Sequence, residues 1–310
     1  MVKFLWGAIK ALRPRQWVKN FALFAPLILS GSLTNDTALI RSFLGFLLFC
    51  GFSSATYLIN DVFDIERDKL HPFKNKRPIA SGLIHPGLAV GTALVLIAIL
   101  LPLSYKLSPA FFSAAVLYLI LQLFYSAYLK HVILFDILVI AAGFVIRVYA
   151  GVWAIDAHLN VWFLLSVTSF ALFLAIGKRR SELTLMQSQA SRHREILLHY
   201  PENLLDILTS MFANSTWLTY AFFAFLQPPI ITPSHVITIF NKLEVPLVEA
   251  KYFMATVPIV IYAVMRYLYI IYEKKEGESP ERVLITDTPL LSSVVIWLLM
   301  VLGIVYYLGA

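Results

Sequence analysis

Three aspartates and an asparagine are grouped in the segment NDVFDIERD, residues 60–68. Asp61, Asp64 and Asp68 follow one another at helical spacing, so on a helix they share one face, and Asn60 lies one turn before the second of them. Carboxylates this close repel one another unless a cation lies between them. Hard oxygen ligands suit Mg²⁺, which typically binds through few carboxylates together with substrate phosphates. The pattern predicts a magnesium-assisted diphosphate site with all four side chains as ligands; the alternative is a solvated acidic helix end.

Basic side chains follow the acidic segment within one short loop, where Lys74 and Arg77 lie beyond His71. A metal-bound diphosphate needs such cations, because Lys or Arg neutralises the oxygens that the metal does not hold. We therefore predict that Lys74 and Arg77 bind the substrate. The alternative is the ordinary positive charge of loops that face the cytoplasm. His71, which precedes a proline, is interpreted as a residue that stops a helix.

Lys130 is the basic residue of a very short turn in the segment YSAYLKH, residues 125–131. If the helices form a closed bundle, Lys130 points at the same mouth as the aspartates, and we predict a catalytic role for it with Asp61 and Asp64. Tyr125 and Tyr128 are either substrate contacts or part of the aromatic belt of a membrane interface.

Two further candidates lie near or within apolar segments. Arg147 lies in the middle of GFVIRVYAG and should face an interior cavity or a carboxylate. It is either an anion contact deep in the pocket or half of a buried ion pair with Asp136. Lys19, in the N-terminal segment RPRQWVKN, could reach into the same cavity and is a further substrate-binding candidate.

A basic cluster, GKRRSEL at residues 177–183, follows a later apolar run. Its candidate substrate-binding residues are Lys178, Arg179, Arg180 and Glu182. Arg192, His193 and Arg194 continue the positive charge. A basic cluster opposite an acidic metal site favours highly anionic substrates, and the alternative is charge that faces lipid headgroups.

The elements that carry these residues are expected to be membrane-spanning helices. The chain has 310 residues, is 59% hydrophobic and only 14% charged, and has a mean hydropathy of +0.77, whereas soluble domains carry about a quarter charged residues. The net charge of +7 falls in short loops between apolar runs, which favours contact with anionic lipids over nucleic acid binding. Cys50 is the single cysteine, so no disulfide within the chain is possible.

Runs of about 20 apolar residues, the length needed to cross a bilayer, predict an all-α bundle of about nine transmembrane helices in one domain, residues 1–310. The expected spans are 17–34, 39–60, 87–105, 109–129, 132–154, 160–177, 205–227, 251–272 and 289–308. Most of the 25 Lys and Arg residues fall on one side if the N-terminus is inside. We therefore expect an inner-membrane protein with a cytoplasmic N-terminus and cytoplasmic active-site loops at about 61–86 and 178–204.

The motif formed by Asn60, Asp61, Asp64 and Asp68 at the end of the second span resembles the first signature of the UbiA superfamily of intramembrane prenyltransferases. The longer patterns RPRQWVKN, DxxxDxxHPxKxxRPIAxG, YSxxLKH, DIxxxAxGFxxR and GKRRxEL are similar to its decaprenyl-phosphate phosphoribosyltransferase branch. Members that prenylate aromatic acceptors usually have a second aspartate motif, where this chain has its basic cluster.

The resemblance implies an Mg²⁺-dependent enzyme that transfers 5-phosphoribose from 5-phosphoribosyl 1-diphosphate to a polyprenyl phosphate, releasing diphosphate, for cell-envelope glycan precursors. The basic cluster would then bind the ribose phosphate or the lipid phosphate. One alternative is the same fold moving a prenyl group from a prenyl diphosphate to an aromatic or other small acceptor. Another is a non-enzymatic transporter of lipid-linked or anionic cargo, with which the midspan arginines Arg147 and Arg266 are compatible.

Overall fold

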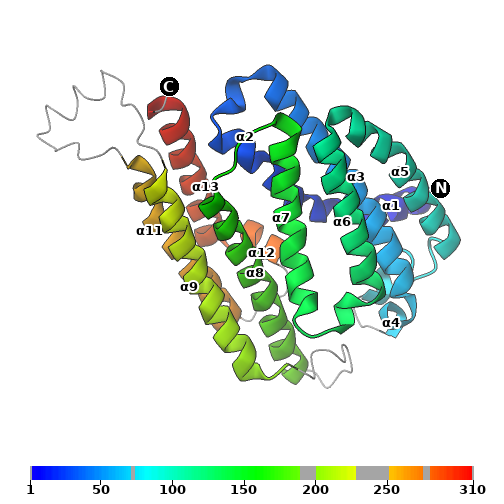
Figure 1. Cartoon of the computed structure of the whole chain (residues 1–310). Helices are drawn as coiled ribbons and strands as arrows, with labels where there is room; N and C mark the ends of the chain where they lie inside the picture. Colours follow the sequence, from blue (N-terminus) through cyan, green and yellow to red (C-terminus); the bar gives the residue numbers. More distant parts are fainter. Residues whose placement is uncertain (1, 71–73, 189–199, 228–250, 275–279, 309–310) are drawn as a thin grey trace, which may run out of the picture. The chain divides into compact units, whose positions relative to one another are not determined.

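The computed structural model describes residues 2–70, 74–188, 200–227, 251–274 and 280–308, and the regular structure in these ranges is helical (Figure 1). The described residues fall into two units. Unit 1 contains those up to Leu27 and from Leu33 to His158. Unit 2 contains Ile28–Ser32 and the described residues from Leu159 onward.

Unit 1 consists of long helices joined by short helical turns. In chain order they are α1 (Val2–Ala11), the 3-10 helix η1 (Pro14–Phe24), α3 (Asp36–Phe63), α4 (Ile65–Leu70), the 3-10 turn η3 (Lys74–Lys76), α5 (Pro86–Leu107), α6 (Pro109–Ala127), the 3-10 turn η4 (Leu129–His131) and α7 (Phe135–Ile155). The short helices α2 (Ala25–Leu29) and η2 (Ser32–Thr34) contain residues of both units.

Local signals set where the long helices of unit 1 begin. The side chain of Asn35 accepts a hydrogen bond of 3.0 Å from the backbone N–H of Ala38 and so caps α3. Pro86 and Pro109 occupy the first turns of α5 and α6, where a missing N–H costs nothing. The ends of the apolar helices are therefore encoded locally, and the turns between them are short.

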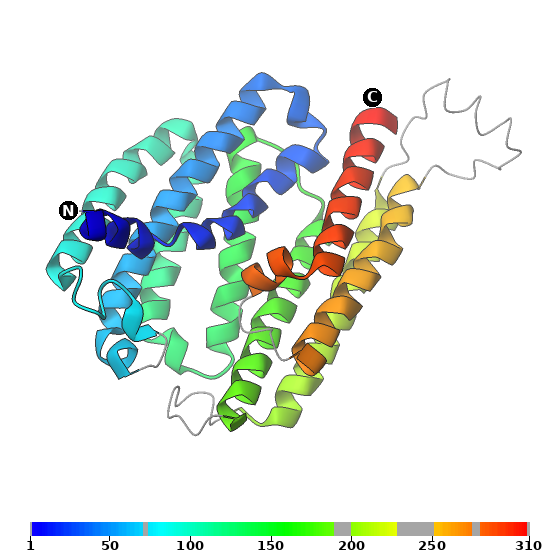
Figure 2. The same cartoon turned by 180° about the vertical axis from the view of Figure 1, so that it is seen from behind.

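Helix α3 is the centre of unit 1 and contacts η1, α5, α6 and α7. Its core is apolar and rich in aromatic rings; fully or almost fully buried members include Leu23, Phe49, Phe52, Phe111, Ala115 and Tyr118. Figure 2 shows α1 and η1 running across the long helices of this unit. Residues at the end of α3 are consequently within reach of both the N-terminal segment and the turn after α6.

The backbones of η1 and α7 approach each other closely at Gly151. A Cβ atom at this position would lie 2.2 Å from the carbonyl oxygen of Leu23. Only a glycine permits this distance, because the atom that it would meet belongs to the backbone and cannot rotate away. Gly151 thereby allows η1 to lie directly on α7.

Unit 2 also consists of helices. They are α8 (Val161–Ser188), α9 (Glu202–Leu226), η6 (Tyr252–Thr256), α11 (Val257–Tyr269), the π-helical turn η7 (Ile270–Lys274), α12 (Pro280–Thr286), α13 (Thr288–Leu302) and the π-helical turn η8 (Gly303–Leu308). Helix α8 packs along α9, and α11 contacts both α9 and α13. The core of this unit includes Phe173, Ala213, Val264, Tyr267 and Ile271.

Seven helices in the described part of the chain are long and apolar enough to cross a membrane. They are α3, α5, α6, α7, α8, the stretch Tyr252–Lys274 and the stretch Thr288–Leu308. Many large apolar side chains on them are exposed, as expected of helices that face lipid. The predicted all-α membrane fold is confirmed.

The count of about nine spans is not confirmed. The expected span 205–227 is a helix, α9, but it is not among the seven, and its first turns carry Glu202 and Asp206. The expected span 17–34 is divided between η1, α2 and η2. Pro26 explains one division, because proline suits the first turn of a new helix better than the interior of an existing one.

Candidate functional site

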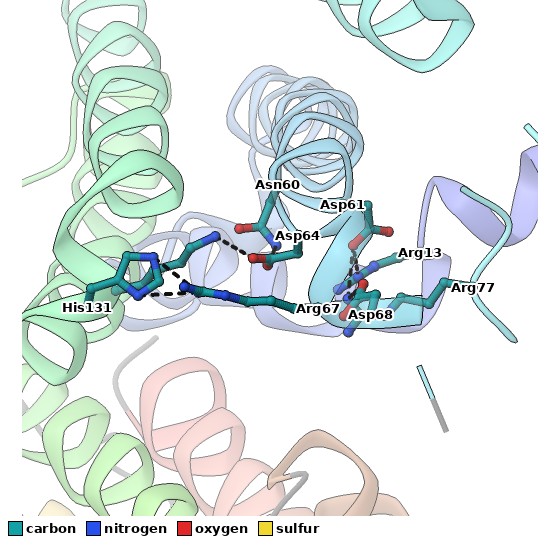
Figure 3. Close-up of polar contacts among 9 residues, drawn as sticks. Arg13, Asn60, Asp61, Asp64, Arg67, Asp68, Arg77 and His131 are labelled. Atoms are coloured by element: carbon teal, nitrogen blue, oxygen red, sulfur yellow. Dashed lines mark hydrogen bonds and ion pairs between the residues drawn. The ribbon is translucent and has the colours of Figure 1, made fainter. Parts of the chain in front are cut away.

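The acidic segment contains a break between two helices. Helix α3 ends at Phe63, Asp64 follows as its C-cap, and α4 restarts at Ile65. The side chains of Asp61 and Asp68 consequently point to one side, and those of Asn60 and Asp64 to the other (Figure 3). The single face predicted from spacing is thus divided into two groups, because that prediction assumed an uninterrupted helix.

The first group joins two carboxylates through arginine. Nη1 of Arg77 lies 3.1 Å from Oδ1 of Asp61 and 2.5 Å from Oδ2 of Asp68. Arg13 contacts the same Oδ1 of Asp61, and its guanidinium lies 4.9 Å from the centre of the Tyr57 ring. Asp61 is only 2% exposed. Arg77 therefore lies between two buried carboxylates, where the sequence analysis expected Mg²⁺, and its predicted contact with substrate stays a prediction.

The contact made by Arg13 was not predicted. Its backbone has a φ of 53° and a ψ of 58°, the left-handed region that non-glycine residues seldom adopt. This bend separates α1 from η1 and directs the chain across α3. Asp61 is 48 residues away in sequence, so the contact between Arg13 and Asp61 cannot be predicted from local spacing. The unusual backbone conformation is a feature that the sequence alone did not reveal.

The second group centres on Asp64. Its Oδ1 accepts a hydrogen bond of 2.7 Å from Nζ of Lys130, and its Oδ2 accepts one of 3.1 Å from Nδ2 of Asn60. Lys130, on η4, is only 7% exposed. The predicted position of Lys130 beside the aspartates is confirmed. A largely buried ammonium held against a carboxylate can shift toward an anionic ligand without crossing bulk water.

A divalent metal fits the second group chemically. Oδ1 of Asn60 is buried and has no hydrogen-bond partner, so a hard oxygen ligand is available next to the carboxylate of Asp64. The described residues contain no cluster of three or more His, Cys, Asp or Glu side chains that could hold a metal. Mg²⁺ usually needs only one or two carboxylates and takes its other ligands from phosphate and water.

Arg67 and His131 link α4 to η4, a contact that the sequence analysis missed. Nη1 of Arg67 lies 3.4 Å from Nδ1 and 3.3 Å from Nε2 of His131, and both residues are exposed (Figure 3). In the sequence, Arg67 is one of many basic residues between the apolar runs. Arg67 lies three residues after Asp64, and His131 directly follows Lys130. The contact could have been predicted from this spacing.

The other candidates of unit 1 lie on the elements around these groups. Lys19 lies on η1 and Lys74 on η3, both partly buried. Tyr125 is partly buried in α6, and Tyr128, just after it, is 66% exposed. Their contacts with substrate stay predictions, and His71 lies outside the described residues.

Arg147 is 5% exposed and makes its contacts with neutral groups. It donates to Oδ1 of Asn20 at 2.7 Å, to the carbonyl of Gly143 at 2.7 Å and to the Tyr118 hydroxyl at 3.0 Å. The structure does not contain the ion pair of Arg147 with Asp136 that was one of the two expectations. The two residues are eleven positions apart on α7, which separates them by about 16 Å at a rise of about 1.5 Å per residue. Arg147 ties η1, α6 and α7 together.

The basic cluster of unit 2 is engaged in ion pairs of its own. Arg179, 1% exposed, lies 2.5 Å from Glu182, and Lys178 lies 4.0 Å from the same carboxylate. Arg180 contacts Glu202 at 2.5 Å and Asp206 at 2.6 Å. Their predicted contacts with phosphate therefore stay predictions, and an anion would have to compete with these carboxylates. Arg192, His193 and Arg194 lie outside the described residues.

The sequence matches the model of the UbiA prenyltransferase family over residues 21–286. It is 33% identical over 304 residues to decaprenyl-phosphate phosphoribosyltransferase of Corynebacterium glutamicum, covering 97% of this chain and 87% of that one. A protein of the same name from Mycolicibacterium smegmatis is 32% identical over 305 residues, covering 97% and 93% of the two chains.

The fold is also similar to that of a solved UbiA homolog from Archaeoglobus fulgidus, described as bound to GPP and Mg²⁺. The TM-score is 0.69 at 20% sequence identity, and the match covers 96% of this chain and 99% of that one. At this identity the likeness concerns the fold alone. The sequence relatives, in contrast, align over nearly their whole length.

Proposed function

The chain belongs to the UbiA prenyltransferase family, and from that premise we propose that it transfers 5-phosphoribose from 5-phosphoribosyl 1-diphosphate to a polyprenyl phosphate, with release of diphosphate. The observation that carries the proposal is the alignment of 97% of this chain with two proteins named decaprenyl-phosphate phosphoribosyltransferase. The same observation favours this function over prenyl transfer to a small acceptor and over transport.

The reaction requires two anions to meet. A phosphate oxygen of the lipid forms a bond to C1 of the ribose while the bond from C1 to the diphosphate oxygen breaks, and the diphosphate leaves with the electron pair. The lipid phosphate is already an anion, so no general base is needed. Catalysis then rests on alignment and on cations placed where the leaving group gains charge.

Lys130 and Arg77 are suited to that task. Each is held by the carboxylates of the acidic segment, and each carries N–H groups that can donate hydrogen bonds to diphosphate oxygens. Lys74, on the same loop, would assist. In this proposal Asp61 and Asp64 hold these cations in place as well as providing oxygen ligands.

Mg²⁺ is the cofactor that the ligand types favour, and it would neutralise the diphosphate and polarise its bond to C1. Asp64 and Asn60 are the first candidates to hold it, with Asp61 and Asp68 as the further candidates predicted from sequence. The unpartnered Oδ1 of Asn60 supports this choice. For Asp61 and Asp68, Arg77 would have to move or share the carboxylates.

The proposal also places the protein and its substrates. The family and the seven apolar helices make this an integral membrane protein. We place it in the inner membrane as one domain, with the N-terminus and active-site loops on the cytoplasmic side, where the soluble sugar donor is found. The product would serve cell-envelope glycan synthesis.

The test uses the purified full-length protein in detergent. It is incubated with 5-phosphoribosyl 1-diphosphate labelled in the ribose and with decaprenyl phosphate, in the presence of Mg²⁺ or EDTA. Label is expected in the organic phase only when Mg²⁺ and the lipid are both present. Folded protein that moves no label would overturn the proposal, and label from a prenyl diphosphate appearing on a small acceptor would then establish prenyl transfer.

A further inference from the structure

The contact between Arg67 and His131 has an unusual geometry. Nη1 of the arginine is almost equally far from the two ring nitrogens of the histidine, at 3.3 and 3.4 Å. One N–H cannot point along a straight line to both nitrogens, because they lie on different sides of the ring. The guanidinium therefore lies against the imidazole rather than forming one well-directed hydrogen bond with it. Its donors remain available to a ligand.

The charges around Arg67 also differ from those around the neighbouring cations. Arg13, Arg77 and Lys130 each contact a carboxylate of the acidic segment. Within the described ranges, Arg67 has no carboxylate at ion-pair distance. Its contact in these ranges is with His131, a side chain that is neutral or positive. An anion placed beside the guanidinium and the imidazole would be attracted by the positive charge of this pair.

The position of this pair is defined by the diphosphate candidates. Arg67 lies three residues after Asp64, and His131 directly follows Lys130. The contact of Arg67, on α4, with His131 therefore lies next to the contact of Asp64, at the end of α3, with Lys130 (Figure 3). A ligand that bridges the two contacts needs two phosphate-bearing ends a short distance apart.

We propose that Arg67 and His131 bind the 5-phosphate of the sugar donor, while the group around Asp64 and Lys130 binds its 1-diphosphate. The inference rests on the proposed function and deepens it. Arg and His are chemically suited to a phosphomonoester, since a guanidinium donates two parallel N–H groups and an imidazole donates a third. Both side chains are exposed, which favours the water-soluble donor over the lipid phosphate as the source of the monoester.

The decisive experiment varies the donor and the protein together. Donor kinetics are measured for the wild type, Arg67→Ala and His131→Ala, with 5-phosphoribosyl 1-diphosphate and with ribosyl 1-diphosphate, which lacks the 5-phosphate. Each substitution should raise KM for the phosphorylated donor about 10- to 100-fold with a small change in kcat, since hydrogen bonds to charged groups contribute about 1.5–3 kcal/mol. Neither substitution should change KM for ribosyl 1-diphosphate, the donor that lacks the 5-phosphate.

Lys69→Ala is the matched control. Lys69 lies on the same short helix, is exposed, and pairs with Glu66 at 2.8 Å, so its removal also deletes one positive charge. It should leave KM for both donors at the wild-type value. An equal rise for Lys69→Ala and Arg67→Ala would show a general effect of charge and overturn the assignment.

A binding measurement separates the possible sources of the phosphate. Ribose 5-phosphate is titrated into the purified protein without metal, and decaprenyl phosphate is titrated in parallel. Arg67→Ala should weaken binding of ribose 5-phosphate about 10-fold or more and leave binding of the lipid unchanged. Weakening of lipid binding alone would assign the pair to the acceptor phosphate and overturn the inference.

Failure of this inference is distinct from failure of the proposed function. A wild type that transfers phosphoribose, with variants that keep its KM and its affinity for ribose 5-phosphate, overturns the role of Arg67 and His131 and leaves the function intact. A folded wild type that transfers no phosphoribose overturns both the proposed function and this inference. Retained folding of each variant is checked by its melting temperature in detergent.

Discussion

Nζ of Lys130 lies 2.7 Å from Oδ1 of Asp64, although 66 residues separate the two in sequence. The pair joins the C-terminal end of α3 to the turn after α6. Because Lys130 is almost fully buried, the two charges interact with less screening than a surface pair. The contact holds a metal-ligand candidate and a diphosphate-binding candidate in a fixed relation before any substrate arrives.

We expect Asp64→Asn and Lys130→Met each to lower kcat/KM about 100- to 1000-fold, the size of effect seen when one preorganised charge at a reacting centre is removed. Because the two side chains touch, the double variant should lose less than the product of the single losses. Steady-state kinetics with the labelled donor measure all three.

Glu66→Gln is the control for these variants. Glu66 lies two residues from Asp64, its side chain is 84% exposed, and its partner is Lys69. Its substitution should leave kcat/KM within about twofold of the wild type, since exposed ion pairs contribute little. Strictly multiplicative losses for Asp64→Asn and Lys130→Met would mean that the contact has no part in catalysis.

Arg147→Met should lower the thermal stability of the protein. It removes the donors that Asn20 and Tyr118 use inside unit 1 and leaves them their longer contacts with Ser53, at 3.3 and 3.4 Å. Each hydrogen bond to a charged group contributes about 1.5–3 kcal/mol. The melting temperature of Arg147→Lys should fall between those of the wild type and Arg147→Met, because one ammonium cannot replace a guanidinium that bonds to three elements. Melting temperature in detergent is the measurement.

Arg282→Met serves as the comparison for Arg147. Arg282 is exposed on α12, so its replacement by Met removes one positive charge and should leave the melting temperature of the protein unchanged. If Arg147→Met also melts at the wild-type temperature but transfers no phosphoribose, the alternative role of Arg147 as an anion contact gains direct support.

Gly151→Ala should destabilise unit 1. The added Cβ would lie 2.2 Å from the carbonyl oxygen of Leu23, so η1 must move away from α7. Overpacking of this kind typically costs about 1–3 kcal/mol. Gly91→Ala, in the interior of α5, is the control, because a Cβ there meets no atom within 4 Å. Equal melting temperatures for the two variants would contradict the close approach.

Asp287→Asn should reduce the dependence of stability on acid pH. Hydrogen bonds from Arg266, at 3.0 and 2.9 Å, lower the pKa of Asp287 below its ordinary value despite the opposing effect of burial, and Lys274 adds to this. A carboxyl with a lowered pKa in the folded protein stabilises it above the pKa of the unfolded chain, about 3.9. That contribution is lost as the pH falls below this value.

Between pH 6 and about pH 3, the melting temperature of the wild type should therefore fall more than that of Asp287→Asn. The asparagine can still accept the hydrogen bond from the N–H of Leu290 and cap α13, while the charge and the Oδ2 acceptor used by Arg266 and Lys274 are lost. Parallel melting curves across this pH range would show that the pair with Arg266 contributes nothing to stability.

Sequence reasoning located the main groups of the candidate site where helices end. Asp64 and Lys130 each follow an apolar run directly, so the membrane topology alone placed them at one mouth. The same reasoning expected Asp61, Asp64 and Asp68 on one face, which the break between α3 and α4 prevents. A helix break at the end of a span leaves no clear mark in hydrophobic spacing.

The contacts that the sequence missed depend on long-range packing. Arg13 reaches Asp61 because of a left-handed residue in the N-terminal segment. Arg180 finds Glu202 and Asp206 because α9 returns along α8. In both cases the partner is defined by how two helices pack, which residue type and periodicity do not determine.

The partners of Arg147 have one more consequence, which concerns the order of synthesis. Asn20, Ser53, Tyr118 and Gly143, the groups to which it donates, all precede it in the chain. When a ribosome delivers α7 to the membrane, the residues that can satisfy its guanidinium have therefore already been made. A charge that would oppose the insertion of an isolated helix can thus enter a bilayer in which its hydrogen-bond acceptors are present.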